Sequence, residues 1–327
     1  MRLFVTGGAG FIGSNFVRWV LHTHPDVRVT NYDKLTYAGN PANLKDVADD
    51  PRYRFVRGDI ADGDLLRREL PGHDAVVNFA AESHVDRSIS GAQPFLTTNV
   101  VAAGTLFDAA RDAEVPQFLH ISTDEVYGSI APGRSAREDD PLLPNSPYSA
   151  SKAGADLLAR ASAVTHGYPI TITRTSNTFG PYHYPEKVIP LFITNLLEGR
   201  PVPLYGDGTN VRDWLYVLDN VRAQWLVLTE GEPGAIYNVG AGNEMSNLDL
   251  AHRILDRMGA GDDMITYVAD RPGHDLRYSV DTTRITGLGW APRYPFDEAL
   301  DRTIDWYRAH DRWWRPLKAD AFASRTA

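Results

Sequence analysis

Short apolar runs alternate with amphipathic stretches through the first half of the chain. Five runs have the length and composition of buried β-strands, at 3–6, 27–32, 54–57, 75–79 and 118–122. Helical periodicity separates several of them, most clearly at 11–21 and 98–113. Because strands that alternate with helices form parallel sheets covered on both faces, the pattern predicts an α/β fold with a doubly wound parallel sheet.

The alternation weakens after about residue 178, where Pro and Gly become frequent. The stretch "GRPVPLYGDGTNVRDW" has the composition of loops, whereas "AIYNVG", near Ala235, again has the pattern of a strand. We therefore predict a first domain over 1–178, to which 211–241 returns. A smaller, loop-rich α/β region is expected over 179–210 and 242–327.

Composition and charge narrow the classes of function. The 327 residues, 43% of them hydrophobic, can bury a large core. The net charge of -9 argues against a nucleic-acid partner or an anionic membrane surface, but it allows a local cationic pocket for a small anion. Because the chain has no cysteine and no histidine at ligand spacing, no metal site is expected. With no signal peptide and no apolar run near the roughly 20 residues of a membrane span, a cytoplasmic protein is expected.

The first strand leads directly into "TGGAGFIG" and an amphipathic helix. Its glycines fit G-x-G-x-x-G, with Gly8, Gly10 and Gly13, and also a wider spacing that begins at Gly7. Either arrangement brings a pyrophosphate close to the backbone at the positive end of the helix. Asp33 follows Gly13 by 20 residues, where a carboxylate accepts hydrogen bonds from ribose hydroxyls and repels a 2′-phosphate. A plain tight turn is the alternative to the Rossmann-type, NAD-binding domain that this pattern predicts.

A second motif, "SPYSASKAGADLLAR", places Tyr148 and Lys152 one helical turn apart. An ammonium beside a phenol favours the phenolate, and lowering a tyrosine pKa from about 10 to about 7 needs roughly 4 kcal/mol. Such a phenolate could take the proton of an alcohol while hydride leaves the same carbon for NAD. Tyr and Lys share this spacing by chance on many helices, but here they follow a dinucleotide motif and a hydroxyl at a strand end, Thr123.

These residues together resemble the extended short-chain dehydrogenase/reductase family, whose members act on nucleotide sugars. Five further stretches are similar to the dTDP-glucose 4,6-dehydratase family within it, and the resemblance runs from residue 1 to about Leu317. They are "FAAESHVDRSI", "STDEVYG", "SNTFGPYHYPEKVIP", "NVRDWLYV" and "ADRPGHDLRY". The resemblance implies an NAD-dependent hydro-lyase that converts dTDP-glucose to dTDP-4-keto-6-deoxyglucose.

The resemblance also assigns catalytic roles. Tyr148, assisted by Lys152 and Thr123, would remove the proton of the 4-hydroxyl as hydride moves from C4 to NAD. Glu125 would then remove the C5 proton, which the C4 ketone acidifies, and Asp124 would protonate the departing C6 hydroxyl. Adjacent carboxyl groups suit this reaction because one is protonated while the other is ionised. Since the pleat of a continuing strand would point them in opposite directions, we expect the chain to turn at Thr123.

Further contacts follow from the same resemblance. The implied cofactor contacts, besides Tyr148 and Lys152, are Gly7, Gly10, Phe11, Ile12, Gly13, Asp33, Lys34, Thr36, Asp59, Ile60, Ala80, Ala81, Ser83 and Thr98. The implied substrate contacts are Ser83 and Thr123 at the hexose, Asn177, Glu186, Lys187, Arg212, Asn247, Arg271 and His274 at the nucleotide diphosphate, and Pro203 and Tyr205 near the base. Thr178 departs from the family, which commonly has a second Asn there at the nicotinamide end.

Four other functions remain open from the sequence. A UDP-sugar 4,6-dehydratase would differ in the base that it recognises. A nucleotide-sugar epimerase would share the cofactor motif but would not need the two carboxyl groups, and a UDP-glucuronate decarboxylase usually has Ser in place of Asp124. A catalytically silent NAD-binding regulatory module often loses the Tyr or the Lys. Family members pair through helices that correspond to 98–113 and 148–164, so a homodimer is expected.

Overall fold

The computed structural model describes residues 1–323, and its largest element is a parallel sheet. The sheet has seven strands in the order β10-β6-β5-β4-β1-β2-β3, and each neighbouring pair is parallel. The strands are β1 (Arg2–Thr6), β2 (Arg28–Asp33), β3 (Tyr53–Arg57), β4 (Ala75–Asn78), β5 (Gln117–Thr123), β6 (Thr171–Thr175) and β10 (Ile236–Val239). The predicted α/β Rossmann-type fold is confirmed.

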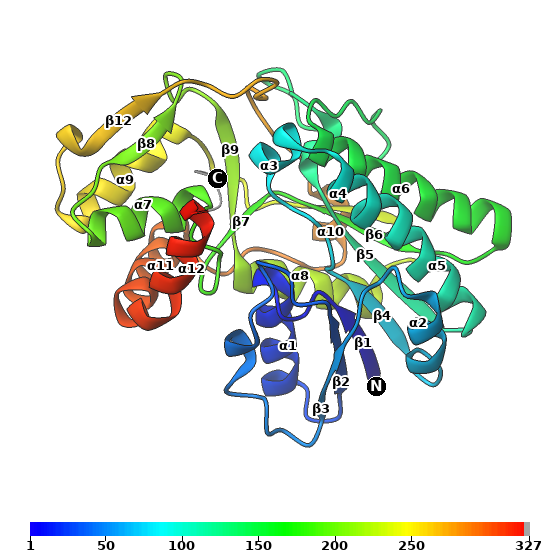
Figure 1. Cartoon of the computed structure of the whole chain (residues 1–327). Helices are drawn as coiled ribbons and strands as arrows, with labels where there is room; N and C mark the ends of the chain where they lie inside the picture. Colours follow the sequence, from blue (N-terminus) through cyan, green and yellow to red (C-terminus); the bar gives the residue numbers. More distant parts are fainter. Residues whose placement is uncertain (324–327) are drawn as a thin grey trace.

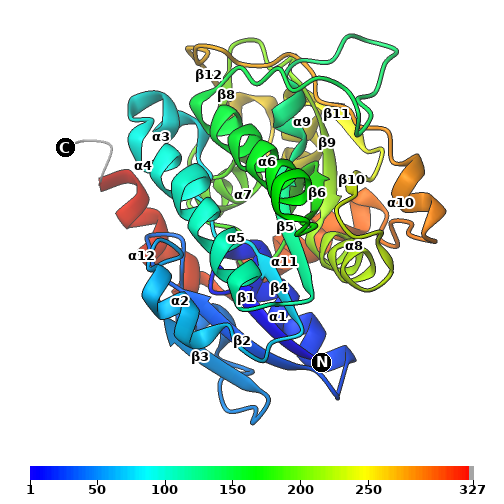
Figure 2. The same ribbon diagram turned by 90° about the vertical axis from the view of Figure 1, so that its right-hand side faces the viewer.

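Helices cover both faces of this sheet (Figure 2). One face packs against α1 (Phe11–Thr23) and α8 (Val217–Glu230), and the other against α2 (Gly63–Glu69), α5 (Ala103–Asp112) and α6 (Pro147–His166). A sheet covered on both faces needs apolar side chains on both. In β1 they alternate between the faces, because Leu3 and Val5 belong to one hydrophobic cluster and Phe4 to the other. No helix within residues 1–323 is both long enough and apolar enough to cross a membrane.

Strand β3 is not the buried strand that its apolar run suggested. It lies at the edge of the sheet, beyond β2, and Phe55 is 39% exposed. Covering helices reach the central strands on both faces but leave β3 largely open, so its arginines extend into solvent. The expected helix at 98–113 is also more complex, since a π-helical segment η2 (Leu96–Ala102) precedes α5.

The second half contains more regular structure than the expected loop-rich region. It has a three-stranded sheet in the order β11-β9-β7 and a two-stranded sheet of β12 and β8. The strands are β7 (Asn177–Phe179), β8 (Val202–Tyr205), β9 (Val211–Tyr216), β11 (Glu244–Ser246) and β12 (Ile265–Val268). The helices beside them, at the left of Figure 1, are α7 (Val188–Leu197), α9 (Asn247–Met258), α11 (Phe296–Ala309) and α12 (Asp311–Ala323).

Shorter helices connect these parts. They are η1 (Pro41–Leu44), α3 (Val85–Ser90), α4 (Gln93–Phe95), η3 (Asp124–Tyr127), η4 (Asp262–Met264) and α10 (Thr283–Gly287). Within the returning segment 211–241, α8 packs on the large sheet and β10 pairs with β6, whereas β9 pairs with β7 and β11. The division of the chain into a cofactor domain and a substrate region stays a prediction.

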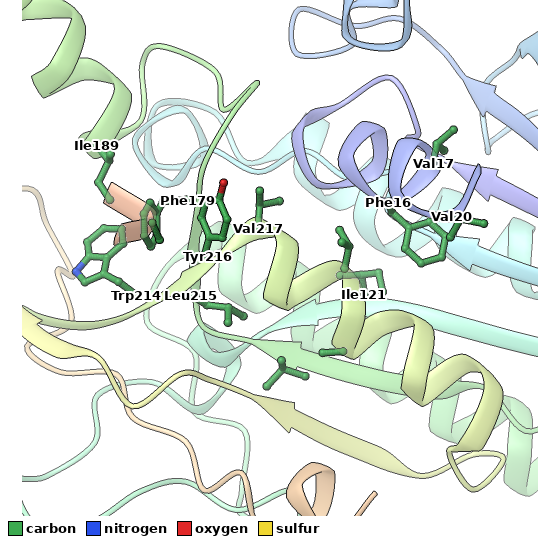
Figure 3. Packing of buried hydrophobic residues seen from close by; sticks show 14 of the residues in the cluster. Phe16, Val17, Val20, Ile121, Phe179, Ile189, Trp214, Leu215, Tyr216 and Val217 are labelled. Carbon is green, nitrogen blue, oxygen red and sulfur yellow. The ribbon is translucent and has the colours of Figure 1, made fainter. Parts of the chain in front are cut away.

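One hydrophobic cluster extends from the large sheet into the second half. Figure 3 shows its members Phe16 and Val20 on α1, Ile121 on β5, and Phe179 and Trp214 on the small three-stranded sheet. These five side chains are at most 7% exposed. Because interiors are packed at the density of organic crystals, such a shared cluster holds the two halves in a fixed relative position.

The central position of β5 gives a test of the fold. Leu119 of β5 is completely buried, so Leu119→Ala should lower the free energy of unfolding by about 2–5 kcal/mol, because truncation removes buried contacts and leaves a cavity. Urea denaturation followed by tryptophan fluorescence measures this loss. Leu276→Ala is the control, since Leu276 is 67% exposed and its truncation should change stability by less than about 0.5 kcal/mol. Equal stability of the two variants would contradict the buried position of β5.

Candidate functional site

A cavity of about 1030 Å³ opens where the carboxyl ends of the central strands face the second half of the chain. Every residue given a catalytic, cofactor or substrate role in the sequence analysis lines it. Ligands of open α/β sheets bind at this edge, outside the carboxyl ends of the strands. The residues are therefore in one place, while their individual roles stay predictions.

The glycine turn between β1 and α1 forms one wall of the cavity. Gly7, Gly10 and Gly13 line it, whereas a Cβ on Gly8 would meet the side chain of Asn31 at 2.4 Å, so the wider glycine spacing is the one that faces the cavity. A Cβ on Gly13 would lie 2.3 Å from the carbonyl oxygen of Gly7. Gly10 caps α1 without a side-chain hydrogen bond, so the first N–H groups of the helix remain available to an anion such as a pyrophosphate.

Asp33 ends β2 beside this turn and is 7% exposed. Its Oδ2 accepts a hydrogen bond from the N–H of Ala9 at 2.9 Å, and its Oδ1 accepts one from Leu35 at 2.8 Å. Burial raises the pKa of Asp33, while these two hydrogen bonds oppose the shift. Each carboxylate oxygen keeps a second lone pair, so the group can still accept from ribose hydroxyls. Nearby, Lys34 forms a 2.6 Å ion pair with Asp59. The arrangement fits a dinucleotide.

The chain turns at Thr123, as expected from the two adjacent carboxyl groups. Thr123 ends β5 and caps the short helix η3, and its Oγ1 accepts a hydrogen bond from the N–H of Glu125 at 3.3 Å. The same hydroxyl donates to Oδ1 of Asp124 at 3.2 Å. Because the strand geometry stops here, Asp124 and Glu125 both line the cavity instead of pointing to opposite faces of the sheet.

Asp124 is the more buried of the two acids, at 3% exposed. Burial raises the pKa of its carboxyl well above its usual range, and the negative charges of Glu125 and Asp213 raise it further. Its Oδ2 has no hydrogen-bond partner among the side chains and backbone of residues 1–323. A protonated Asp124 would therefore carry a hydroxyl that is free to donate to a ligand.

Glu125 has a different electrostatic environment. Burial raises the pKa of its carboxyl, but the positive charges of Arg271, Arg212 and Lys187 oppose the shift. The hydroxyl of Tyr278 also lies 3.5 Å from its Oε2. The two adjacent carboxyl groups thus differ in how strongly they favour a proton, because neighbouring acids favour it on Asp124 whereas neighbouring cations oppose it on Glu125.

Tyr148 and Lys152 lie on α6, whose first turn is fixed by a capping box between Ser146 and Ser149. Burial raises the pKa of the Tyr148 phenol, and the charges of Glu125 and Asp124 add to the shift. Without ligands the neutral phenol is therefore favoured, and the expected phenolate of the reacting complex stays a prediction. Desolvation and two nearby carboxyl groups outweigh the hydrogen bond from Thr123, so ionisation requires further positive charge in the cavity.

Lys152 is held by the strand beside it. Its Nζ donates to the carbonyl of Ile121 at 2.6 Å, and burial lowers the pKa of Lys152 to about 8. The ammonium is thus fixed at the end of β5, where Lys152 lines the cavity. Water does little to stabilise the positive charge of Lys152, because only 4% of the residue is exposed.

Cationic side chains also line the cavity, near Glu125. Lys187 donates to the carbonyl of Ser83 at 2.7 Å, and Arg212 to the carbonyl of Asp275 at 2.9 Å. Arg271 is joined to Asp86 at 3.1 Å, but its buried Nε has no hydrogen-bond partner within residues 1–323. In an acidic protein such a cluster fits a diphosphate, and guanidinium groups suit it because they donate in pairs.

Other expected substrate contacts have protein partners of their own. Tyr205 donates to Oδ2 of Asp86 at 2.9 Å, and His274 pairs with Asp270 at 2.6 Å. Glu186 accepts from the guanidinium of Arg87 at 2.9 Å. In the part of the chain that the structure describes, no group of three His, Asp or Glu side chains could hold a metal ion.

The sequence analysis missed several residues of this cavity. Tyr278 donates to Asp275 at 2.8 Å and lies under the guanidinium of Arg212, and Asp86 bridges two of the expected substrate contacts. Both were inside stretches quoted for the resemblance, "DLRY" and "HVDRSI", but no spacing rule singles them out. Thr178 lines the cavity, where its hydroxyl accepts from Asn220 at 2.8 Å; its effect on cofactor retention stays open.

Replacement of Asp33 tests the cofactor end. Asp33→Ala should weaken binding of NAD and reduce discrimination against NADP, because both a ribose acceptor and a repulsive charge are lost. Loss of a hydrogen bond to a charged group corresponds to roughly tenfold weaker NAD binding. Calorimetric titration with each cofactor measures both effects. Asp64→Ala is the control, since its side chain is 84% exposed on α2, and unchanged affinities in Asp33→Ala would show that Asp33 does not contact the cofactor.

Known proteins share this sequence and fold over nearly the whole chain. A profile described as GDP-mannose 4,6 dehydratase matches residues 4–303. A dTDP-glucose 4,6-dehydratase of Streptomyces niveus is 54% identical over 324 residues, which cover 98% of this chain and 96% of the relative. A crystal structure of DesIV, a dTDP-glucose 4,6-dehydratase of Streptomyces venezuelae with NAD bound, is 56% identical with a TM-score of 0.95, over 97% of this chain and 100% of that chain. A UDP-glucose 4-epimerase of Thermotoga maritima has a TM-score of 0.87 but only 28% identity, over 94% of this chain and 99% of that chain.

The fold is therefore shared with epimerases, whereas the high sequence identity is shared with dehydratases. The identity extends over both halves of the chain and so includes the cavity between them. The chain belongs to the dTDP-glucose 4,6-dehydratase family.

Proposed function

We propose that this protein converts dTDP-glucose to dTDP-4-keto-6-deoxyglucose, with NAD as a cofactor that is regenerated in each turnover. The observation that carries the proposal is the pair Asp124 and Glu125, which face one cavity and of which Asp124 favours the proton more strongly than Glu125. Elimination of water needs a base and an acid at once, and this pair supplies both. The names of the relatives support the substrate and the cofactor.

Oxidation of C4 comes first. Tyr148 takes the proton of the 4-hydroxyl, and the hydroxyl of Thr123 stabilises the phenolate that this requires. Gly10 and the first turn of α1 would hold the pyrophosphate of NAD, and Asp33 its ribose hydroxyls. Bound NAD would supply the hydride acceptor for C4 and the hydride donor for C6, and the positive charge of its ring would favour the Tyr148 phenolate.

Elimination follows and uses Asp124 and Glu125, the two residues after Thr123. The C4 ketone acidifies the C5 proton, and the Glu125 carboxylate removes it. Asp124 donates its proton to the C6 hydroxyl, which leaves as water, so one proton moves onto Glu125 and one leaves Asp124. Glu125 then returns a proton to C5 while C6 takes up hydride and becomes a methyl group. Release of the proton on Tyr148 and uptake of one by Asp124 restore the starting state. Lys187, Arg212 and Arg271 would hold the diphosphate and keep Glu125 ionised until the step begins.

Other functions are less well supported. An epimerase or a decarboxylase has no use for a protonated acid beside the base, and the buried Asp124 with its unpaired Oδ2 fits such an acid. A silent binding module has no need for Tyr148 and Lys152 on one face of α6. A UDP-sugar 4,6-dehydratase is the strongest alternative, because it would use the same chemistry. Turnover of dTDP-, UDP-, CDP- and GDP-glucose in parallel identifies the base.

We further propose a homodimer, paired through η2, α5 and α6, which lie side by side at one surface of the molecule (Figure 2). Leu96, Val101, Leu157 and Val164 support this, since these apolar side chains are between 44% and 72% exposed on η2 and α6. Exposed apolar patches on soluble domains commonly mark interaction sites. A cytoplasmic location stays a prediction.

Replacement of Asp124 tests the acid. Asp124→Asn keeps the shape of the side chain but removes the proton that the leaving hydroxyl needs. Oxidation at C4 should survive and elimination should slow by about 10² to 10⁴, so reduced-nicotinamide absorbance should accumulate in a single turnover. Stopped-flow absorbance measures it. Asp301→Asn on α11, where the side chain is 59% exposed, is the control. If the Asp124→Asn variant forms no reduced cofactor at all, Asp124 is not the acid of the elimination step.

Isotope transfer tests the whole reaction. dTDP-glucose with deuterium at C4 should give product with that deuterium in the C6 methyl group of the same molecule. Unlabelled substrate in heavy water should give a solvent deuteron at C5, because a proton on the Glu125 carboxyl exchanges. Mass spectrometry of product from mixed labelled and unlabelled substrate measures both. Label that remains at C4 indicates an epimerase, and label lost to solvent or exchanged between sugars contradicts the proposed mechanism.

A further inference from the structure

A buried ion pair lies behind Tyr148 and Lys152, and the reaction described above makes no use of it. Asp156 stands one turn beyond Lys152 on α6, so the three residues share one face of the helix at i, i+4 and i+8. Oδ2 of Asp156 accepts from Nε of Arg174 on β6 at 2.8 Å. The two charged side chains are 1% and 4% exposed, and neither lines the cavity.

Arg174 is fixed from several sides. Its Nη1 donates to the hydroxyl of Tyr127 at 2.7 Å and to the carbonyl of Glu138 at 3.1 Å, and its guanidinium lies 4.8 Å from the centre of the Tyr127 ring. The Tyr127 hydroxyl in turn donates to Asn238 of β10 at 2.8 Å. This network leaves the guanidinium in one position, and Asp156 is the carboxylate that it holds there.

Asp156 keeps one oxygen uncommitted. Its Oδ1 is buried and has no hydrogen-bond partner in the part of the chain that the structure describes. Buried ion pairs contribute little to stability compared with apolar side chains of similar volume, because both charges lose their hydration. A carboxylate with an unsatisfied oxygen is a still poorer stabilising element, so its position behind Lys152 points to an electrostatic use.

We propose that Asp156 is a positioning residue whose negative charge keeps the Lys152 ammonium charged. The proposal deepens the function given above and rests on it for the role of Lys152. It assigns no contact with the sugar or the cofactor to Asp156.

The surroundings of Lys152 explain why such support is needed. Burial lowers the pKa of Lys152 to about 8, and the negative charge of Asp156 opposes this shift. From β5, His120 adds no positive charge, because burial and the nearby Lys152 ammonium hold its pKa well below the usual range. From α6, Tyr148 adds no negative charge in the chain without ligands, because burial raises the pKa of its phenol. Around Asp156 itself, the charged neighbours are Lys152 and Arg174.

The sign of the effect follows from these charges. If the Lys152 ammonium assists Tyr148, the enzyme is active at pH values below the pKa of Lys152, where the side chain is charged, and loses activity above it. Removing the negative charge of Asp156 makes the ammonium less stable and moves this loss of activity to lower pH. Removing the positive charge of Arg174 does not, since a neighbouring cation disfavours a second one.

Two isosteric or near-isosteric variants therefore separate the electrostatic role from a structural one. The chain has five lysines, Lys34, Lys45, Lys152, Lys187 and Lys318, so the titration of Lys152 can be followed by NMR of protein with ¹³Cε-labelled lysine. A Lys152→Arg variant assigns the signal. Asp156→Asn should lower the pKa of Lys152 by about one unit, as expected for loss of a unit charge one helical turn away. Arg174→Gln should leave the pKa unchanged or raise it.

Both variants break the same ion pair, so a purely structural role predicts the same effect for both. Asp219→Asn is a matched control, because Asp219 is equally buried on α8 and pairs with Arg222 at 2.8 Å. It should lower stability without changing the titration of Lys152. If Asp156→Asn does not fold, the double variant Asp156→Asn with Arg174→Met removes both charges and should still lower the pKa of Lys152.

The same proteins report on catalysis. In Asp156→Asn the alkaline loss of kcat should move to lower pH together with the NMR titration, while KM for dTDP-glucose stays unchanged, because Asp156 does not line the cavity. An unchanged Lys152 titration in Asp156→Asn, or an equal decrease in Arg174→Gln, overturns the role of Asp156. A shifted titration without a shifted kcat profile upholds that role and contradicts the assignment of Lys152 to the reaction.

Discussion

Parallel pairing of β5 on both sides is the constraint on which the site depends. β5 pairs with β4 and β6, in a register that brings Thr123 beside Thr175. Because all strands of the sheet run in one direction, their carboxyl ends meet at one edge, and helices on both faces keep water away from the strands themselves. Polar side chains can then be exposed to a ligand only where a strand ends, as at Asp33 and Thr123.

Loss of hydration governs the charges at this edge. Asp124, Tyr148 and Lys152 are each at most 9% exposed, so each favours its neutral form unless a neighbour stabilises the charge. Neighbours are distributed unequally: cations surround Glu125, whereas Asp124 is close to other acids. The chemical difference between two identical functional groups thus arises from the elements on the far side of the cavity, β9 and the loop before α10. The turn at Thr123, which carries both acids, does not by itself produce this difference.

Local patterns in the sequence were sufficient for the fold and for part of the site. Periodicity located the strands and helices of the first half within a few residues, and the glycine motif located the turn before α1. It could not show that β3 is an edge strand, because edge position depends on strand order, which periodicity does not contain. Asp86, Tyr278 and the pair of Asp156 and Arg174 were missed for a related reason. Apart from the local Tyr278–Asp275 hydrogen bond, their partners lie between 18 and 185 residues away and are brought together only by tertiary packing.

The hydrophobic cluster that extends from α1 through β5 to α11 and α12 has a consequence for how ligands exchange. Separation of the two halves would expose Phe16, Trp214 and Trp314 together, and burial of each such side chain contributes about 1.5–3 kcal/mol or more. A wide hinge motion is therefore as costly as a substantial part of global unfolding. Entry and departure of a nucleotide sugar must rely on small movements of the segments at the rim, such as the loop that carries Arg271. The molecule should unfold as one cooperative unit although its chain passes three times between the two halves.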